Sequence, residues 1–153
     1  MASTTFSGPV TSTNGFIGNI TGNLTGNIAG TAEITHATTA AINATATATA
    51  AEVATGYITS TSAAATTITL PTGTLLGAAL GAVRGTVFDL YVDNTAGAST
   101  VTMAVAVNGI LSSAAADTPG SFGDLTVAAG ATGIARFTLM FASATAYTFS
   151  RTA

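Results

Sequence analysis

The sequence predicts an all-β protein, with an extended N-terminal arm or stalk followed by an antiparallel, jelly-roll-like β-sandwich that carries one short helix. Two observations support this prediction. The C-terminal part holds most of the aliphatic and aromatic residues, in short alternating segments separated by turn residues, a pattern typical of sandwiches. The N-terminal part is repetitive, poor in large side chains and unable to build a core alone. We therefore place the arm at residues 1–62 and the sandwich at residues 63–153.

Alternation of apolar and polar residues marks the strands of the sandwich, because successive side chains of a strand point to opposite faces. The predicted strands are Thr66–Leu70, Thr86–Val92, Thr100–Val107, Leu125–Ala128, Ile134–Phe141 and Tyr147–Arg151. Two rows of side chains are expected to face the core, namely Val101, Met103, Val105 and Val107 in one strand and Ala135, Phe137, Leu139 and Phe141 in another. Asn108-Gly109 predicts a hairpin turn.

The one short helix is predicted over residues 74–83. Leu75, Leu76, Leu80 and Val83 recur at helical spacing. Gly77 and Gly81 weaken this helix, since glycine in a helix interior costs about 1 kcal/mol relative to alanine.

The arm contains a Gly-Asn-aliphatic-Thr repeat over residues 18–30. As a helix it would be unstable, because glycine, asparagine and threonine are all poor helix formers. As a strand it places glycine and the aliphatic residue on one face. We expect three identical chains around a common axis, where glycine allows close backbone approach and Ile20, Leu24 and Ile28 fill the centre.

Two alternatives remain for this segment. A flexible tail has a similar composition, whereas a single-chain solenoid is disfavoured because four residues are too few for one coil. We expect residues 31–56 to be extended within the same stalk, since alanine alternates with threonine over residues 44–50.

The composition of the chain points to assembly rather than to nucleic acid or membrane. Charged residues make up 6% of the 153 residues, against about 25% in typical chains, so we expect much of the surface to contact copies of the chain or a larger assembly. The alternative is a Thr/Ser-rich β-protein that is simply neutral. Three Lys and Arg residues and a net charge of −3 cannot supply the clustered cations that DNA binding needs. The apolar run of residues 75–83 is shorter than the roughly 20 residues of a membrane-spanning helix. Residues 1–10 are not expected to form a signal peptide, because they lack a basic region and an apolar core.

The residues needed for catalysis or cofactor binding are scarce. The chain has no cysteine and one histidine, His36, so no catalytic residue, cofactor or metal site is predicted. Asp93, Asp117 and Asp124 do not form a calcium-loop motif and are interpreted as turn residues. Asp89 lies in the middle of a predicted strand, and we expect a structural ion pair with Arg136, with Arg84 as the second candidate partner. Three Asn-x-Thr sequences, at Asn19, Asn23 and Asn43, are interpreted as incidental.

Three segments of the chain resemble virion proteins of tailed bacteriophages, namely head decoration (cement) proteins, head fibres and related structural proteins. The segments are FSGPVTSTNGFIGNITGNLTGN, LPTGTLLGAALGAVRGTVFDLYVDNTAGASTVTMA and VAAGATGIARFTLMFASATAYTFSR. Together they cover most of the chain, and residues 31–62 match only in character.

The resemblance implies a homotrimer on the outer surface of the capsid that binds the major capsid protein and stabilises the shell. The alternative is a head or tail fibre protein that contacts the host surface or its glycans. We expect the N-terminal segment to bind the shell by adding a strand to a neighbouring sheet. The expected capsid or intersubunit contact residues are Phe6, Phe16, Ile17, Gly18, Ile20, Gly22, Leu24, Gly26 and Ile28.

Overall fold

The structure, a computed structural model, describes residue 36, residues 38–111 and residues 125–152. The chain divides into two compact units, Met1–Ile34 and Thr35–Ala153, and the described residues all belong to the second. The expected contact residues of the arm, from Phe6 to Ile28, lie outside the described residues, as do Asp117 and Asp124.

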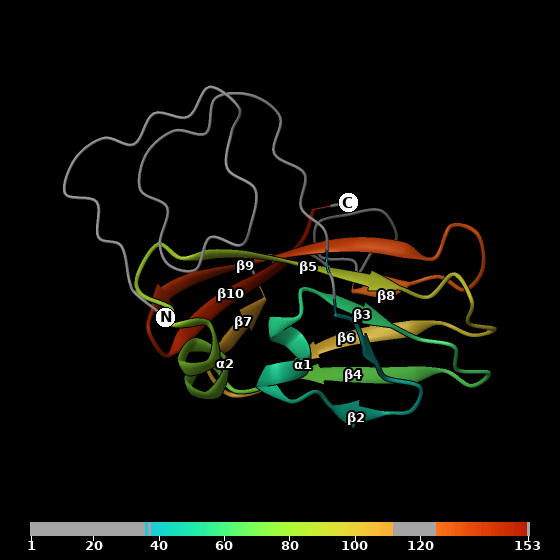
Figure 1. Cartoon of the computed structure of the whole chain (residues 1–153), viewed down its shortest axis with the longest axis horizontal. Coiled ribbons are helices and arrows are strands. Elements are labelled where there is room, and N and C mark those ends of the chain that lie inside the picture. The colour runs from blue at the N-terminus through green and yellow to red at the C-terminus, as the bar shows by residue number, and fades with distance from the viewer. Residues whose placement is uncertain (1–35, 37, 112–124, 153) are drawn as a thin grey trace, which may run out of the picture. The chain divides into compact units, whose positions relative to one another are not determined.

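The second unit is mainly β, as predicted, with two sheets and two short helices (Figure 1). The six-stranded sheet has the order β1 (Ala40–Ala41), β3 (Tyr57–Thr59), β5 (Val87–Asp93), β9 (Ile134–Ser143), β10 (Ala146–Arg151), β7 (Gly109–Leu111). The four-stranded sheet has the order β2 (Ala46–Thr47), β4 (Thr66–Leu70), β6 (Val101–Val105), β8 (Thr126–Val127). The helices are α1 (Ala50–Ala54) and α2 (Gly73–Leu80).

The prediction of antiparallel sheets was wrong, because both sheets are mixed. The pairs β1–β3, β3–β5, β2–β4, β4–β6 and β7–β10 are parallel, whereas β5–β9, β9–β10 and β6–β8 are antiparallel. From β1 to β9, successive strands alternate between the two sheets. Sequence neighbours therefore do not pair in this part of the chain. Over β1 to β6, each strand instead pairs in parallel with the strand two places along, whereas β5 pairs next with β9, and β7 pairs with β10.

At Asn108-Gly109 the predicted turn is present, but it does not form a hairpin. Asn108 has a positive φ of 64°, and the Gly109 N–H donates to the Ala106 carbonyl at 3.0 Å, so the turn forms. It leads out of the four-stranded sheet, however, and β7 pairs with β10 of the other sheet. Because β6 ends at Val105, Val107 lies in this turn and is 72% exposed rather than facing the core.

Residues 40–59, assigned to the stalk from the sequence, contribute β1, β2 and β3 to the two sheets. The predicted boundary at residue 62 lies inside the compact unit that begins at Thr35. Ile42, Val53 and Ile58 are buried in the same core as the later strands. The expectation of purely extended structure up to residue 56 was also wrong, since α1 interrupts it. Its start is fixed by a capping box, in which Thr49 accepts from the Glu52 N–H and the Glu52 carboxylate accepts from the Thr49 N–H.

The core takes residues from both sheets. The row predicted on β9 is confirmed, because Ala135, Phe137, Leu139 and Phe141 are all at most 2% exposed. The same hydrophobic cluster includes residues of the four-stranded sheet, namely Ile68, Leu70, Val101, Met103 and Val127. A single core thus joins the two sheets.

The predicted helix exists but ends earlier than residue 83. It is α2, and Gly81 ends it by adopting a left-handed conformation with a φ of 59°. Gly73 and Gly77 have a packing role, since a Cβ atom at either position would collide with the backbone of Ala144 or Thr145. Glycine therefore allows α2 to lie directly against the turn between β9 and β10.

Candidate interaction surfaces

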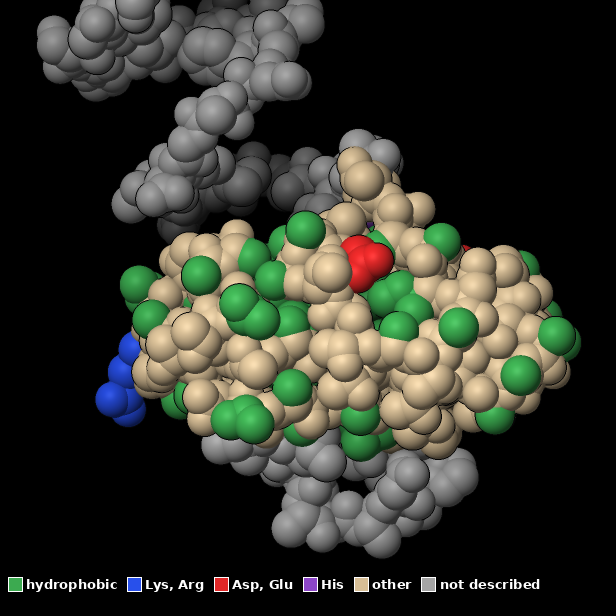
Figure 2. Space-filling view, turned by 90° about the horizontal axis from the view of Figure 1, so that it is seen from below, with side chains coloured by type: hydrophobic (Ala, Val, Ile, Leu, Met, Phe, Trp, Pro, Cys, Tyr) green, Lys and Arg blue, Asp and Glu red, His purple; other side chains and the backbone are tan. Residues whose placement is uncertain are grey.

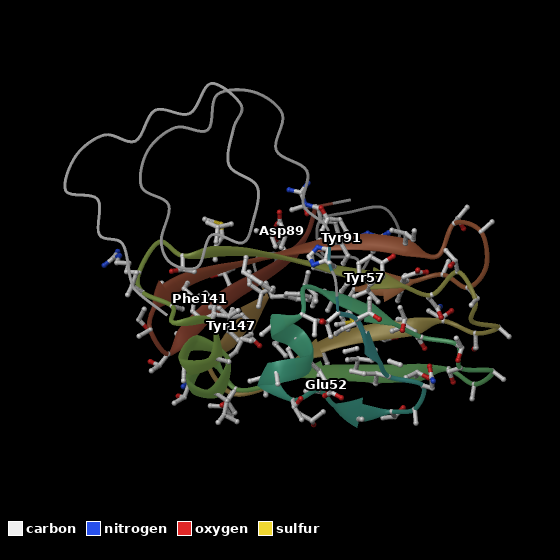
Figure 3. All side chains as sticks on the ribbon, viewed as in Figure 1. Glu52, Tyr57, Asp89, Tyr91, Phe141 and Tyr147 are labelled. Atoms are coloured by element: carbon white, nitrogen blue, oxygen red, sulfur yellow. The ribbon has the colours of Figure 1, made fainter. Side chains whose placement is uncertain are left out.

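An aromatic cluster lies on the outer face of the six-stranded sheet. Tyr57 and Tyr91 are direct partners in the parallel register of β3 and β5. Their rings are stacked with centroids 6.3 Å apart (Figure 3). The His36 ring lies 5.8 Å from the first and 5.6 Å from the second. The cluster therefore joins His36 to two neighbouring strands.

The backbone around Gly56 holds His36 in this cluster. The Nδ1–H of His36 donates to the Thr55 carbonyl oxygen at 2.9 Å. Gly56 has a φ of 74°, and a Cβ atom there would collide with the imidazole ring. Only glycine combines this conformation with room for the ring.

Asp93 extends the cluster with a carboxylate. The Tyr57 hydroxyl donates to Asp93 Oδ2 at 3.0 Å, and Asp93 Oδ1 accepts from the backbone and the hydroxyl of Thr95. The hydrogen bonds from Thr95, more than that from Tyr57, lower the pKa of Asp93. Burial, together with the bond to Asp93, raises the pKa of Tyr57. Asp93 is thus an ionised, hydrogen-bonded residue, and in the part of the chain that the structure describes no cluster of acids and histidine is arranged to hold a metal ion.

The predicted ion pair between Asp89 and Arg136 is present on the same outer face. Arg136 Nη2 lies 3.3 Å from Asp89 Oδ2, and the side chains are 44% and 37% exposed, respectively. The Thr138 hydroxyl donates to the other carboxylate oxygen at 2.7 Å. Arg84, the second candidate, is exposed and forms no salt bridge with a described carboxylate. A half-exposed pair of this kind contributes at most about 1 kcal/mol, so its role is structural and modest.

The outer face of the four-stranded sheet carries threonine in register. Thr67, Thr102 and Thr126 are partners across β4, β6 and β8. Thr45 continues this row, because its hydroxyl accepts from the Thr67 N–H at 3.1 Å. In the following row, Thr47 is the partner of Thr69. These rows make the outer face of this sheet polar but uncharged.

A third surface is formed by α2 and the residues that follow it. The outward side chains are Leu75, at 59% exposure, then Ala78 and Ala79, and finally Val83, at 64% exposure. We call these four residues the helix patch. The patch and α2 itself contain no charged residue. Figure 2 shows the molecule from below, where apolar side chains lie among backbone and uncharged polar groups, with few charged side chains between them.

Sequence reasoning found the ion pair but missed the aromatic cluster and the helix patch as surfaces. Tyr57 was assigned to the stalk and Tyr91 to the sandwich, so nothing in the sequence placed them side by side. The signal for the helix patch was available, because α2 is almost entirely apolar, yet the segment was interpreted only as a short helix weakened by glycine.

Neither helix in the described part of the chain is long and apolar enough to cross a membrane. Comparison of the chain with protein-family models, with curated proteins and with solved structures found no match.

Proposed function

We propose that this chain is a structural virion protein, a capsid decoration (cement) protein that binds the outer surface of a phage head as a homotrimer and stabilises the shell. The observation that carries this proposal is the resemblance of its N-terminal repeat and its β-rich C-terminal segments to such proteins. The role is structural, and the proposal assigns no catalytic residue and no cofactor.

The character of the described surface supports a role in assembly. Two large apolar side chains of the helix patch, Leu75 and Val83, are more than half exposed. Charged side chains are sparse throughout the chain. Exposed apolar surface of this kind marks contacts with other macromolecules more often than a free surface.

The two compact units have different roles in this function. The two sheets form the layers of a β-sandwich with mixed strand directions, which projects from the shell or caps the trimer. The segment from Thr4 to Gly30 contacts the major capsid protein by adding a strand to its sheet, with Phe6, Phe16 and Ile17 as apolar anchors. The Gly-Asn-x-Thr repeat brings the three copies together.

Such binding stabilises the shell by mass action. A protein that binds the assembled lattice and not the free capsomer lowers the free energy of the assembled state alone. At a free concentration one hundred times the Kd, each site contributes about 2.7 kcal/mol. No chemical step is needed for this effect.

The proposal is tested on capsids of the cognate major capsid protein that lack this chain. We expect the added protein to coat them at a regular, high copy number and to raise the temperature at which the shells open in calorimetry. A control uses a variant with Phe6, Phe16 and Ile17 changed to Ser, which is expected to fold and to leave the shells bare. Failure of the full-length protein to bind these shells would overturn the proposed function.

A fibre protein that contacts host glycans is the second candidate, and the aromatic cluster is the observation that favours it. Aromatic faces beside a few fixed polar groups are typical of small-ligand sites, and here Tyr57 and Tyr91 lie beside the Asp93 carboxylate. Sparse copies on the particle, together with binding to a glycan array that Tyr91→Ala abolishes, would favour this function over decoration.

A further inference from the structure

We propose that the helix patch is the surface through which copies of this chain meet, with Arg84 of one copy paired to Glu52 of the next. The inference rests on the proposed homotrimer, for which it supplies an interface, and the occupant of the patch is a second copy of the chain.

The composition of α2 is unusual for a helix with one side exposed. Its sequence, GTLLGAAL, contains no charged residue and one polar side chain. A helix that is apolar on every side is normally buried on every side. Here Leu76, Gly73 and Gly77 face the core, whereas Leu75, Ala78 and Ala79 face outward and are exposed. The composition of α2 therefore fits a helix that is covered on both sides.

The neighbour of α2 at this end of the molecule is α1. The strands β2 and β4 are parallel, so they end at the same edge of their sheet. α1 follows β2 and α2 follows β4, and the two helices contact each other. Glu52 of α1 therefore belongs to the same end of the molecule as the helix patch. Figure 3 shows Glu52 on α1, beside α2.

Arg84 and Glu52 are the charged residues nearest to the helix patch along α2 and α1. Arg84 comes directly after Val83, is exposed, and has no salt bridge to a carboxylate of the described residues. Glu52 uses its Oε2 atom to accept from the backbone and the hydroxyl of Thr49, which leaves Oε1 available. Hydrogen bonds from Thr49 lower the pKa of Glu52, so the carboxylate is ionised at neutral pH.

These charges favour a second copy over an unrelated partner. When identical molecules place such a patch around a symmetry axis, the basic edge of each copy can meet the acidic edge of the next. Repeated around a closed ring, the contact places each Arg84 beside the Glu52 of its neighbour and covers each helix patch. If the patch contacted a capsid protein instead, Arg84 and Glu52 would not be paired with each other.

The test measures the mass of the full-length protein in solution by sedimentation over a range of concentrations. The wild type is expected at three times 14.8 kDa. Leu75→Lys is expected to raise the dissociation constant at least tenfold, because the charge would be buried in the interface. Met140→Lys is the matched control. Met140 is 56% exposed on the outer face of the six-stranded sheet, away from the helix patch, so this variant should leave the mass unchanged.

A charge exchange distinguishes pairing from a general effect of charge. Arg84→Glu should weaken the trimer, and adding Glu52→Arg to it should restore the trimer in part, since the two charges are then exchanged. Arg84 makes no contact with a described carboxylate, so Arg84→Glu is expected to fold, which circular dichroism verifies. A trimer that withstands Leu75→Lys and Arg84→Glu equally would overturn the inference.

The outcomes separate this inference from the proposed function. If the patch variants remain trimeric and lose binding to the shell, the patch docks on the capsid, and the inference is wrong while the function stands. If the wild-type trimer dissociates in the patch variants but never binds shells, the function is wrong while the inference stands. A wild-type protein that is monomeric at all concentrations overturns the trimer and the inference together.

Discussion

The hydroxyl of Tyr147 donates a hydrogen bond of 3.0 Å to the carbonyl oxygen of Pro71, inside the core. Tyr147 belongs to β10 of the six-stranded sheet, and Pro71 connects β4 of the four-stranded sheet to α2. One hydrogen bond thus ties together the two sheets and the start of the helix that carries the helix patch. Burial of the hydroxyl raises the pKa of Tyr147 to about 12.

Removing this hydroxyl should destabilise the fold without disturbing its packing. We expect Tyr147→Phe to lower the free energy of unfolding by about 1 kcal/mol, since the Pro71 carbonyl loses its buried donor. Chemical denaturation measures the change. The slope of the transition should stay the same, because the aromatic ring still fills its place beside Phe141. An unchanged midpoint would contradict the assigned bond.

Because of its raised pKa, Tyr147 should also make the protein less stable at high pH. The pKa of Tyr147 is raised from 10.0 to about 12 by folding, so the folded state favours the protonated hydroxyl. This contribution is complete below pH 10 and is lost as the pH rises toward 12. Tyr57 has a raised pKa too, and the effect of Tyr147 is therefore the difference between the wild type and Tyr147→Phe. Denaturation curves at pH 9 to 11.5 should converge for the two proteins; parallel curves would exclude this role of Tyr147.

Asn94 is expected to be the most sensitive polar residue in the described part of the chain. It is fully buried, and its Nδ2 group lies within hydrogen-bond distance of the carbonyl oxygens of Ser99, Val127 and Ala128. Three acceptors around one amide fix its orientation, and the Oδ1 atom is left without a hydrogen bond.

Asn94→Asp tests this arrangement with almost no change of shape. An ionised carboxylate would face three carbonyl oxygens and accept from none of them, so we expect a loss of about 3 kcal/mol at pH 7. The protonated acid can donate one bond, which raises the pKa of the new residue in the folded state. Stability should therefore recover in part as the pH falls toward 4, whereas the wild type should not gain stability over that range. Thermal melting at the two pH values checks the prediction.

Substituting two glycines with positive φ distinguishes the cost of backbone strain from the cost of a clash with His36. Gly56 and Gly130 have φ values of 74° and 82°, but only Gly56 has a neighbour where a Cβ atom would lie. We expect Gly130→Ala to cost about 1 kcal/mol, for the backbone alone. Gly56→Ala should cost distinctly more and should shift the NMR resonances of the His36 ring. Equal losses for the two variants would mean that the imidazole moves aside freely.

The ion pair on the outer sheet face should matter little. Arg136→Gln is expected to lower the free energy of unfolding by less than about 1 kcal/mol, because both side chains are partly exposed. The loss should shrink in 1 M salt, which screens charges at this distance. A salt-independent loss would indicate that the Arg136 side chain acts through packing on Tyr91, its direct partner in the register of β5 and β9.

Much of the local structure followed from the sequence. The alternation of residues 134–141 predicted β9 and its buried row, and residues 66–70 form β4 with the predicted bounds. The helix was expected because of its leucine spacing, and Gly81 explains its earlier end. The Asp89–Arg136 pair was also predictable, since two charged residues in the middle of apolar strands favour each other as partners.

By itself, the sequence determined most strands of residues 63–153, which side of these strands is apolar, and how few charges the chain carries. Only the tertiary structure decided which strands pair and in which direction, because alternation reports that one face is buried and says nothing about the neighbour that lies beside it. For that reason Tyr57 and Tyr91, distant in the chain, became partners through the parallel register of β3 and β5. The outward side of α2 was settled in the same way, since the packing of Gly73 and Gly77 against the β9–β10 turn fixed which side of an almost entirely apolar helix stays exposed.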